Sequence, residues 1–157
     1  MKASATTLTC TAGTAPGRPV TFQPSIGLLP RAVEARGTVY LGTCTSPNGR
    51  ATRLRTGRLI FDGTATASCA SATGVSGQAR IAWYNARGRY VGTSVLRADT
   101  SSLTSSNPAD AFMTGAITSG PLAGRHASAQ AAPSSSLTNC ALQGVSSLSG
   151  TGRMTIS

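Results

Sequence analysis

Arginine is the residue type whose abundance and spacing most suggest chemistry in this chain. The sequence holds 14 Lys and Arg against 4 Asp and Glu, a formal net charge of +10. A planar guanidinium can hold a phosphate or a carboxylate through two hydrogen bonds at once. The candidate residues for binding an anion or a partner are Arg53, Arg55, Arg58, Arg80, Arg87 and Arg89, with Tyr84 and Tyr90 among them.

Spacing brings some of these cations together. On an extended strand Arg53 and Arg55 share one face, and Arg80 precedes a hairpin that carries two further arginines. The neighbouring tyrosines could stack on a sugar or a base, whereas Trp83 alternates with Ile81 and is expected in the core. Outside a cell the available polyanions are wall teichoic acids, anionic lipid head groups and stray nucleic acid, and the positive charge would speed any such encounter.

Acidic residues and histidine are too few to suggest a catalytic centre. A glycosidase pair would have to come from the four carboxylates, which are Glu34, Asp62, Asp99 and Asp110. A Ser-His-Asp site would need His126, the single histidine, and no G-x-S-x-G elbow accompanies it. We therefore expect solvated carboxylates, a surface histidine and a protein that is not an enzyme.

The four cysteines predict disulfides rather than a metal site. They are Cys10, Cys44, Cys69 and Cys140, and none forms a C-x-x-C pair. Four cysteines allow three connectivities. We favour Cys44–Cys69 and Cys10–Cys140, because the first two each end a strand-like run and the other two would tie the chain ends together. We expect no metal and no cofactor.

The elements that must position these residues are short strands separated by turns. Alternation predicts strands near residues 20–22, 32–44, 53–68, 77–84, 89–96, 112–119, 127–131 and 152–156. Asn85-Ala86-Arg87-Gly88 predicts a hairpin turn in which glycine takes a positive φ. About seven to nine strands at this spacing indicate an antiparallel β-sandwich, Ig-like or barrel-like, with two disulfides.

Length and composition fit a single domain. The chain has 157 residues, with 11% charged and 39% hydrophobic residues. We expect a flexible segment over residues 1–9 and one β-sandwich domain over residues 10–157. No apolar run approaches the length of about 20 residues needed for a transmembrane helix, and residues 1–5 lack the apolar core of a signal peptide, so we place any export signal upstream of the mature sequence.

Several phrases along the chain resemble a known group of proteins. An early cysteine is followed by G-T-V-Y-L-G-T-C, G-T-A-T-A-S-C, G-Q-A-R-I-A-W, G-x-I-T-S-G-P-L-A-G, a late cysteine and a closing G-T-G-R-M-T-I. From Cys10 to the C-terminus the chain resembles the small, exported, disulfide-bonded β-sandwich proteins of streptomycetes and related actinomycetes. The resemblance implies fold, secretion and an actinomycete source, and it carries over no site residues.

These observations predict a secreted binding or interaction module. It would act as an adaptor or accessory subunit of an extracellular assembly, pairing with another secreted protein through an exposed strand near Phe22 or the long loop from Asp99 to Asp110. The alternative is a basic, toxin-like or envelope-binding protein that attaches to anionic cell-wall polymers through its arginines. Specific nucleic-acid binding is not expected, and the oligomeric state is left open.

Overall fold

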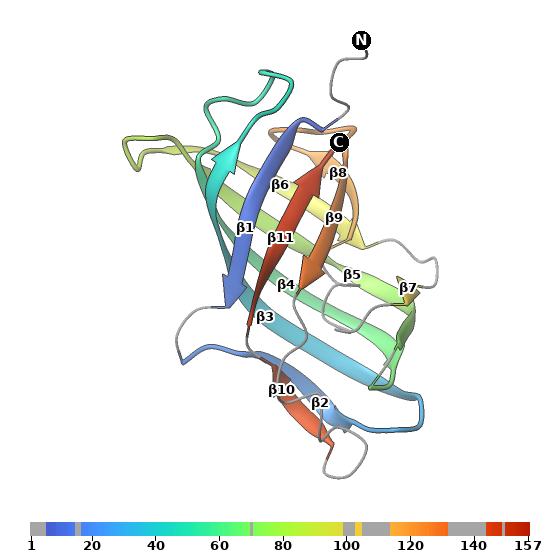
Figure 1. Cartoon of the computed structure of the whole chain (residues 1–157). Coiled ribbons are helices and arrows are strands. Elements are labelled where there is room, and N and C mark those ends of the chain that lie inside the picture. Colours follow the sequence, from blue (N-terminus) through green and yellow to red (C-terminus); the bar gives the residue numbers. More distant parts are fainter. Residues whose placement is uncertain are drawn as a thin grey trace.

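Antiparallel β-strands build the computed structural model of this chain (Figure 1). The structure describes residues 6–14, 17–69, 71–98, 103–104, 114–131, 144–148 and 150–157. The strands are β1 (Leu8–Thr14), β2 (Val20–Ile26), β3 (Arg31–Thr45), β4 (Thr56–Ala67), β5 (Ser71–Tyr84), β6 (Tyr90–Ala98), β7 (Leu103–Thr104), β8 (Gly115–Ser119), β9 (His126–Ala131), β10 (Val145–Leu148) and β11 (Thr151–Ile156). Within these ranges no helix is long and apolar enough to cross a membrane.

Eight of the strands close into a ring. The hydrogen-bonded order is β1-β11-β9-β8-β6-β5-β4-β3, and β1 pairs again with β3 to complete the circuit. Every pairing in the ring is antiparallel, and four of the eight join strands that are consecutive in sequence. The predicted all-β, antiparallel class is confirmed, and the pairing forms a closed barrel of eight strands.

The strand β3 is long enough to serve two partners. Its later part pairs with β1, from Val39 to Thr45, while its earlier part pairs with β2, from Glu34 to Arg36. The remaining edge of β2 pairs with β10, so these two strands extend the sheet beyond the ring. In Figure 1 they lie below the barrel, at the end opposite the two chain termini.

Strict alternation of buried and exposed residues explains why β4 forms the wall of a packed barrel. Leu59 and Phe61 point inward and are at most 3% exposed, whereas Arg58 and Ile60, on either side of Leu59, are exposed. Because side chains alternate between the faces of a strand, one face supplies the core and the other meets solvent. The largest fully buried side chain is Trp83 on β5, as its alternation with Ile81 predicts.

Glycine makes room for the large rings inside the barrel. A Cβ on Gly57 would lie 3.1 Å from Trp83, and a Cβ on Gly37 would lie 2.9 Å from Phe61. Small residues opposite large ones let the interior fill at native packing density. Gly37 of β3 and Gly57 of β4 therefore leave space for the Phe61 and Trp83 rings in the core.

The disulfide between Cys10 and Cys44 corrects the pairing favoured from the sequence. It joins β1 to β3, which are hydrogen-bonded neighbours, and closes a separation of 34 residues. Both predicted bridges, Cys44–Cys69 and Cys10–Cys140, are wrong, because Cys10 and Cys44 are bonded to each other. A Cys44–Cys69 bridge is also excluded by strand direction: β3 and β4 are antiparallel, so Cys44 near the end of β3 and Cys69 just after β4 lie at opposite ends of the sheet. Cys69 is itself disulfide-bonded, and Cys140 lies outside the described residues.

Most of the predicted strands are present, with shifted limits. β1 begins at Leu8, so the boundary expected at residue 9 falls inside a strand whose first residue pairs with Ile156. Residues 1–5 lie outside the described part of the chain, as does most of the predicted loop from Asp99 to Asp110. The strands β1 and β10, together with the two-residue β7, raise the number above the seven to nine expected.

Candidate functional site

One end of the barrel gathers six of the thirteen arginines. Three connections meet there, which are the β3–β4 loop (residues 46–55), the β5–β6 hairpin turn (residues 85–89) and the β8–β9 turn (residues 120–125). We call this region the cationic end. Its arginines are Arg50, Arg53, Arg55, Arg87, Arg89 and Arg125, of which all but the half-buried Arg125 are exposed.

Hydrogen bonds to Thr7, directly before β1, hold the β3–β4 loop in place. Ser46 Oγ donates to the Thr7 carbonyl at 2.6 Å and accepts from the Ala51 backbone N–H at 3.0 Å. Asn48 Nδ2 donates to Thr7 Oγ1 at 3.1 Å. Ala51 and Leu54 are buried, so the loop has apolar anchors of its own. Its arginines therefore project from a segment with a defined conformation.

Asn85 organises the β5–β6 hairpin turn. Its Oδ1 accepts backbone N–H groups from Arg87 at 2.9 Å and from Arg89 at 3.0 Å. The Gly88 N–H donates to the Asn85 carbonyl at 2.9 Å, and Gly88 has a φ of 73°, the left-handed conformation that glycine adopts without strain. This arrangement confirms the predicted turn and places Arg87 at its tip.

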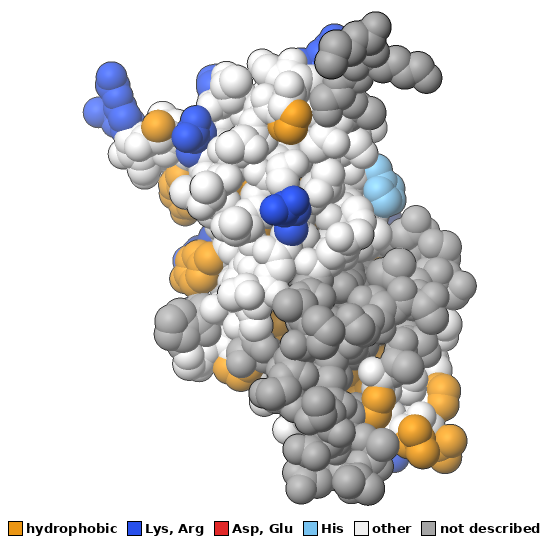
Figure 2. Space-filling model, viewed as in Figure 1, with side chains coloured by type: hydrophobic (Ala, Val, Ile, Leu, Met, Phe, Trp, Pro, Cys, Tyr) orange, Lys and Arg blue, Asp and Glu red, His pale blue; other side chains and the backbone are white. Residues whose placement is uncertain are grey.

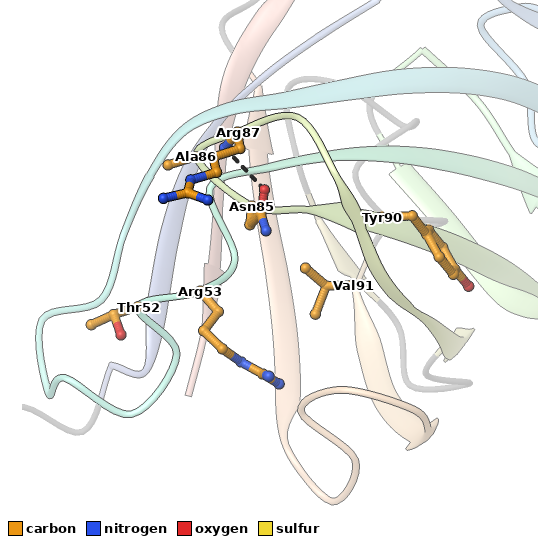
Figure 3. Close-up of a pocket in the computed structure, with 7 residues that line it drawn as sticks. All are labelled: Thr52, Arg53, Asn85, Ala86, Arg87, Tyr90 and Val91. Atoms are coloured by element: carbon orange, nitrogen blue, oxygen red, sulfur yellow. Dashed lines mark hydrogen bonds between the residues drawn. The ribbon is translucent and has the colours of Figure 1, made fainter.

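A hollow of about 450 Å³ lies between the β3–β4 loop and this hairpin (Figure 3). Its lining is Thr52, Arg53, Asn85, Ala86, Arg87, Tyr90 and Val91. In Figure 3 Oδ1 of Asn85 faces the Arg87 backbone, and its amide nitrogen lies on the opposite side, toward Arg53. We call this hollow the Asn85 pocket.

A second hollow continues from the first across the β8–β9 turn. It is lined by Arg50, Ala51, Thr52, Arg53, Leu54, Pro121 and Leu122, so Thr52 and Arg53 belong to both hollows. A buried serine holds the β8–β9 turn in place: Ser94 Oγ donates to the Pro121 carbonyl and accepts the Trp83 indole N–H at 2.8 Å. Both hollows therefore rest on ordered barrel elements.

The Asp and Glu side chains that the structure describes, Glu34 and Asp62, lie away from the cationic end. Arg36 bonds Glu34 Oε1 at 2.7 Å and approaches Asp62 Oδ2 at 3.5 Å. Both carboxylates are exposed on the outer wall of β3 and β4, and each has the same cation as its partner. Asp99 and Asp110 lie outside the described residues. On the face drawn in Figure 2 no acidic side chain is visible beside the arginines at the upper left.

The predicted arginines divide between two places. Arg53, Arg55, Arg87 and Arg89 lie at the cationic end. The expectation that Arg53 and Arg55 share a strand face is wrong, since both residues precede β4 in its loop.

The other two predicted arginines lie on the outer wall of the barrel. Arg58 is paired with Tyr40 on β3, and Arg80 is paired with Ile60 on β4. Tyr40 and Ile60 are 46% and 48% exposed, so this wall is a mixed apolar and cationic surface.

The two predicted tyrosines lie together near the hairpin. The Tyr84 and Tyr90 rings meet edge to face with centroids 6.1 Å apart, and the Tyr90 hydroxyl bonds Thr93 Oγ1. Tyr90 is 61% exposed and lines the Asn85 pocket, while Tyr84 is half-buried. Tyr90 is thus the tyrosine that a ligand in the pocket can reach.

Four residues that line or flank the hollows were not among the site residues predicted from the sequence. They are Arg50, Thr52, Asn85 and Arg125. The signal for Asn85 was present, because an Asn three residues before a turn glycine often accepts backbone N–H groups through its side chain. A second role for its amide nitrogen becomes visible once the β3–β4 loop is placed opposite it.

The part of the chain that the structure describes holds no cluster of metal-ligating residues, and the comparisons with known proteins found no match. His126 is exposed at the start of β9. In the described ranges no three His, Cys, Asp or Glu residues are grouped so as to hold a metal ion. No protein-family model, curated protein or solved structure matches the sequence.

Proposed function

We propose that this protein is an exported, non-enzymatic binding module that attaches to an anionic polymer through the cationic end of its barrel. The observation that carries the proposal is the pair of adjoining hollows that share Arg53 and are lined by arginines from two connections. Loops on a rigid β-scaffold are common binding elements, because the scaffold limits the entropy lost on association. The Cys10–Cys44 bridge supports an oxidising compartment.

Charge distribution favours an anionic partner over a neutral one. In the described part of the chain, Arg36 is the one arginine that forms ion pairs with carboxylates, and it lies on the outer wall of the barrel. Among the described residues, no Asp or Glu side chain lies within ion-pair distance of the arginines of the cationic end. A repeating anion such as a cell-wall polyol phosphate could contact several of them at once, which raises affinity and makes binding sensitive to salt.

A matched pair of double variants tests this proposal. Arg53→Gln with Arg87→Gln removes two charges from the Asn85 pocket, while Arg58→Gln with Arg80→Gln removes two from the wall. We expect the first variant to lose about tenfold or more in affinity for purified wall polymer at low salt, and the second to stay close to wild type. Equal losses in both variants would mean that net charge alone attracts the polymer, and the site would be rejected.

A second candidate function is recognition of another secreted protein, as an adaptor or accessory subunit. It is favoured by Leu28 and Leu29, which are 67% and 76% exposed side by side between β2 and β3. Exposed neighbouring leucines on a β-protein are typical of a contact surface. Light scattering and a high-salt pull-down from the producing culture test it. A stoichiometric partner lost in Leu28→Ser with Leu29→Ser supports the adaptor, and a monomer with no partner in every fraction argues against it.

A further inference from the structure

We infer that the Asn85 pocket binds the phosphate group of a polyol- or sugar-phosphate chain and that the amide of Asn85 is a specific donor to it. This inference rests on the proposed function and narrows it from a charged surface to a defined site. Its basis is the direction imposed on one side chain by the hairpin.

Within the hairpin, the side-chain oxygen of Asn85 is occupied by hydrogen bonds, and the side-chain nitrogen is left for a ligand. Oδ1 accepts the N–H groups of Arg87 and Arg89, so the amide cannot rotate to exchange its oxygen and nitrogen without breaking both bonds. Nδ2 carries two hydrogens and has no acceptor among the described residues. Because a side-chain amide nitrogen only donates hydrogen bonds, the pocket presents a donor at a position that backbone geometry fixes.

Two guanidinium groups and a hydroxyl complete a set of donors. Arg53 enters from the β3–β4 loop and Arg87 from the hairpin tip, on either side of Asn85 (Figure 3). Thr52 adds a hydroxyl to the lining. The described residues that line the hollow include no carboxylate. A tetrahedral oxyanion has acceptor oxygens in several directions, which suits donors supplied by two separate segments better than a planar carboxylate does.

The size and remaining lining of the pocket indicate what the phosphate is attached to. A hollow of about 450 Å³ is much larger than a phosphate group, so it can admit the adjoining unit of a chain. The Val91 side chain and the Tyr90 ring supply apolar contact for the carbons of a polyol or a sugar ring. Proteins that bind single-stranded nucleic acid stack successive bases on several aromatic side chains. The described lining holds one aromatic residue, Tyr90, which favours a polyol or a sugar over a nucleobase.

The substitution Asn85→Asp isolates this donor. An aspartate can still accept both hairpin N–H groups, so the turn is preserved, but it replaces the outward donor with a second anionic oxygen. The control is Arg58→Gln on the wall, which lowers the net charge by the same single unit. Binding of full-length protein to polyglycerol phosphate is measured by calorimetry, and the Asn85 side-chain amide is followed by ¹⁵N NMR with inorganic phosphate added at constant ionic strength.

We expect Asn85→Asp to lower polymer affinity about tenfold or more, the loss typical of a hydrogen bond to a charged group, with the wall control close to wild type. Phosphate should shift the Asn85 amide resonances of the wild-type protein, and chloride should not. If Asn85→Asp equals the wall control and phosphate leaves the amide unmoved, the inference is overturned, even where the double arginine variant still weakens binding. A single-stranded oligonucleotide that binds more tightly than polyglycerol phosphate would also overturn it.

Discussion

Replacing Ser94 with alanine tests how the barrel interior supports the turn above it. Ser94 is fully buried, accepts the Trp83 indole N–H at 2.8 Å and donates to the Pro121 carbonyl. Alanine removes both interactions with almost no change in volume. The indole N–H is left in a core where Trp83 is 0% exposed and water has no access to it.

The magnitude follows from that unsatisfied donor. A buried N–H that loses its partner costs about 1–3 kcal/mol, and we expect Ser94→Ala to lower the free energy of unfolding by about 2 kcal/mol. For a chain of this length each kcal/mol corresponds to about 2–4 °C in Tm. The variant should therefore melt about 4–8 °C below wild type.

Thermal and urea unfolding followed by circular dichroism measure the effect, and Ser119→Ala, at an exposed position on β8, is the control. The decisive comparison repeats Ser94→Ala in a Trp83→Phe background, where no indole N–H exists. There the alanine should cost at least about 1 kcal/mol less, because the donor it would orphan is absent. An identical cost in the two backgrounds would refute the reasoning.

Three further perturbations probe other parts of the molecule. Replacing Cys10 and Cys44 with serine should lower the unfolding free energy by about 4 kcal/mol, from loop closure over 34 residues, and an unchanged urea midpoint would contradict this. Gly57→Val should cost about 1–3 kcal/mol by forcing methyl groups against Trp83, and a wild-type Tm with unshifted tryptophan fluorescence would show that the interior has spare room. Arg36→Gln should change stability by less than about 1 kcal/mol, because both of its ion pairs are exposed; a larger loss by calorimetry would contradict that estimate.

The strands were predictable where one face of the sheet carries buried apolar residues and the other carries exposed polar ones. The alternation of Leu59 and Phe61 with exposed residues marks β4, and Asn85 with Gly88 marks the hairpin. Ring closure was not predictable, because it depends on β1 meeting β3 across a long separation in sequence. The same contact decides the disulfide, so the favoured pairing of Cys44 with the cysteine at the far end of the next strand was wrong.

The positive charge of the candidate site was predictable from the sequence, but the position of its residues in the fold was not. Clustering in sequence grouped Arg53 with Arg58, yet the first lies in a loop at the barrel end and the second on its wall. Asn85 was recognised as a turn residue, and its outward amide matters only because the β3–β4 loop stands opposite it. Both features arise from tertiary packing, which the local pattern of residues does not contain.

The salt dependence of polymer binding tests the central claim most directly. The slope of log affinity against log salt concentration reports how many phosphates the protein neutralises. Removing Arg53 and Arg87 together should reduce that slope by about 2, one for each lost phosphate contact, whereas removing Arg58 and Arg80 should leave it unchanged. Equal slopes for the two double variants, or wild-type binding that persists undiminished at about 0.5 M salt, would contradict a polymer site at the cationic end.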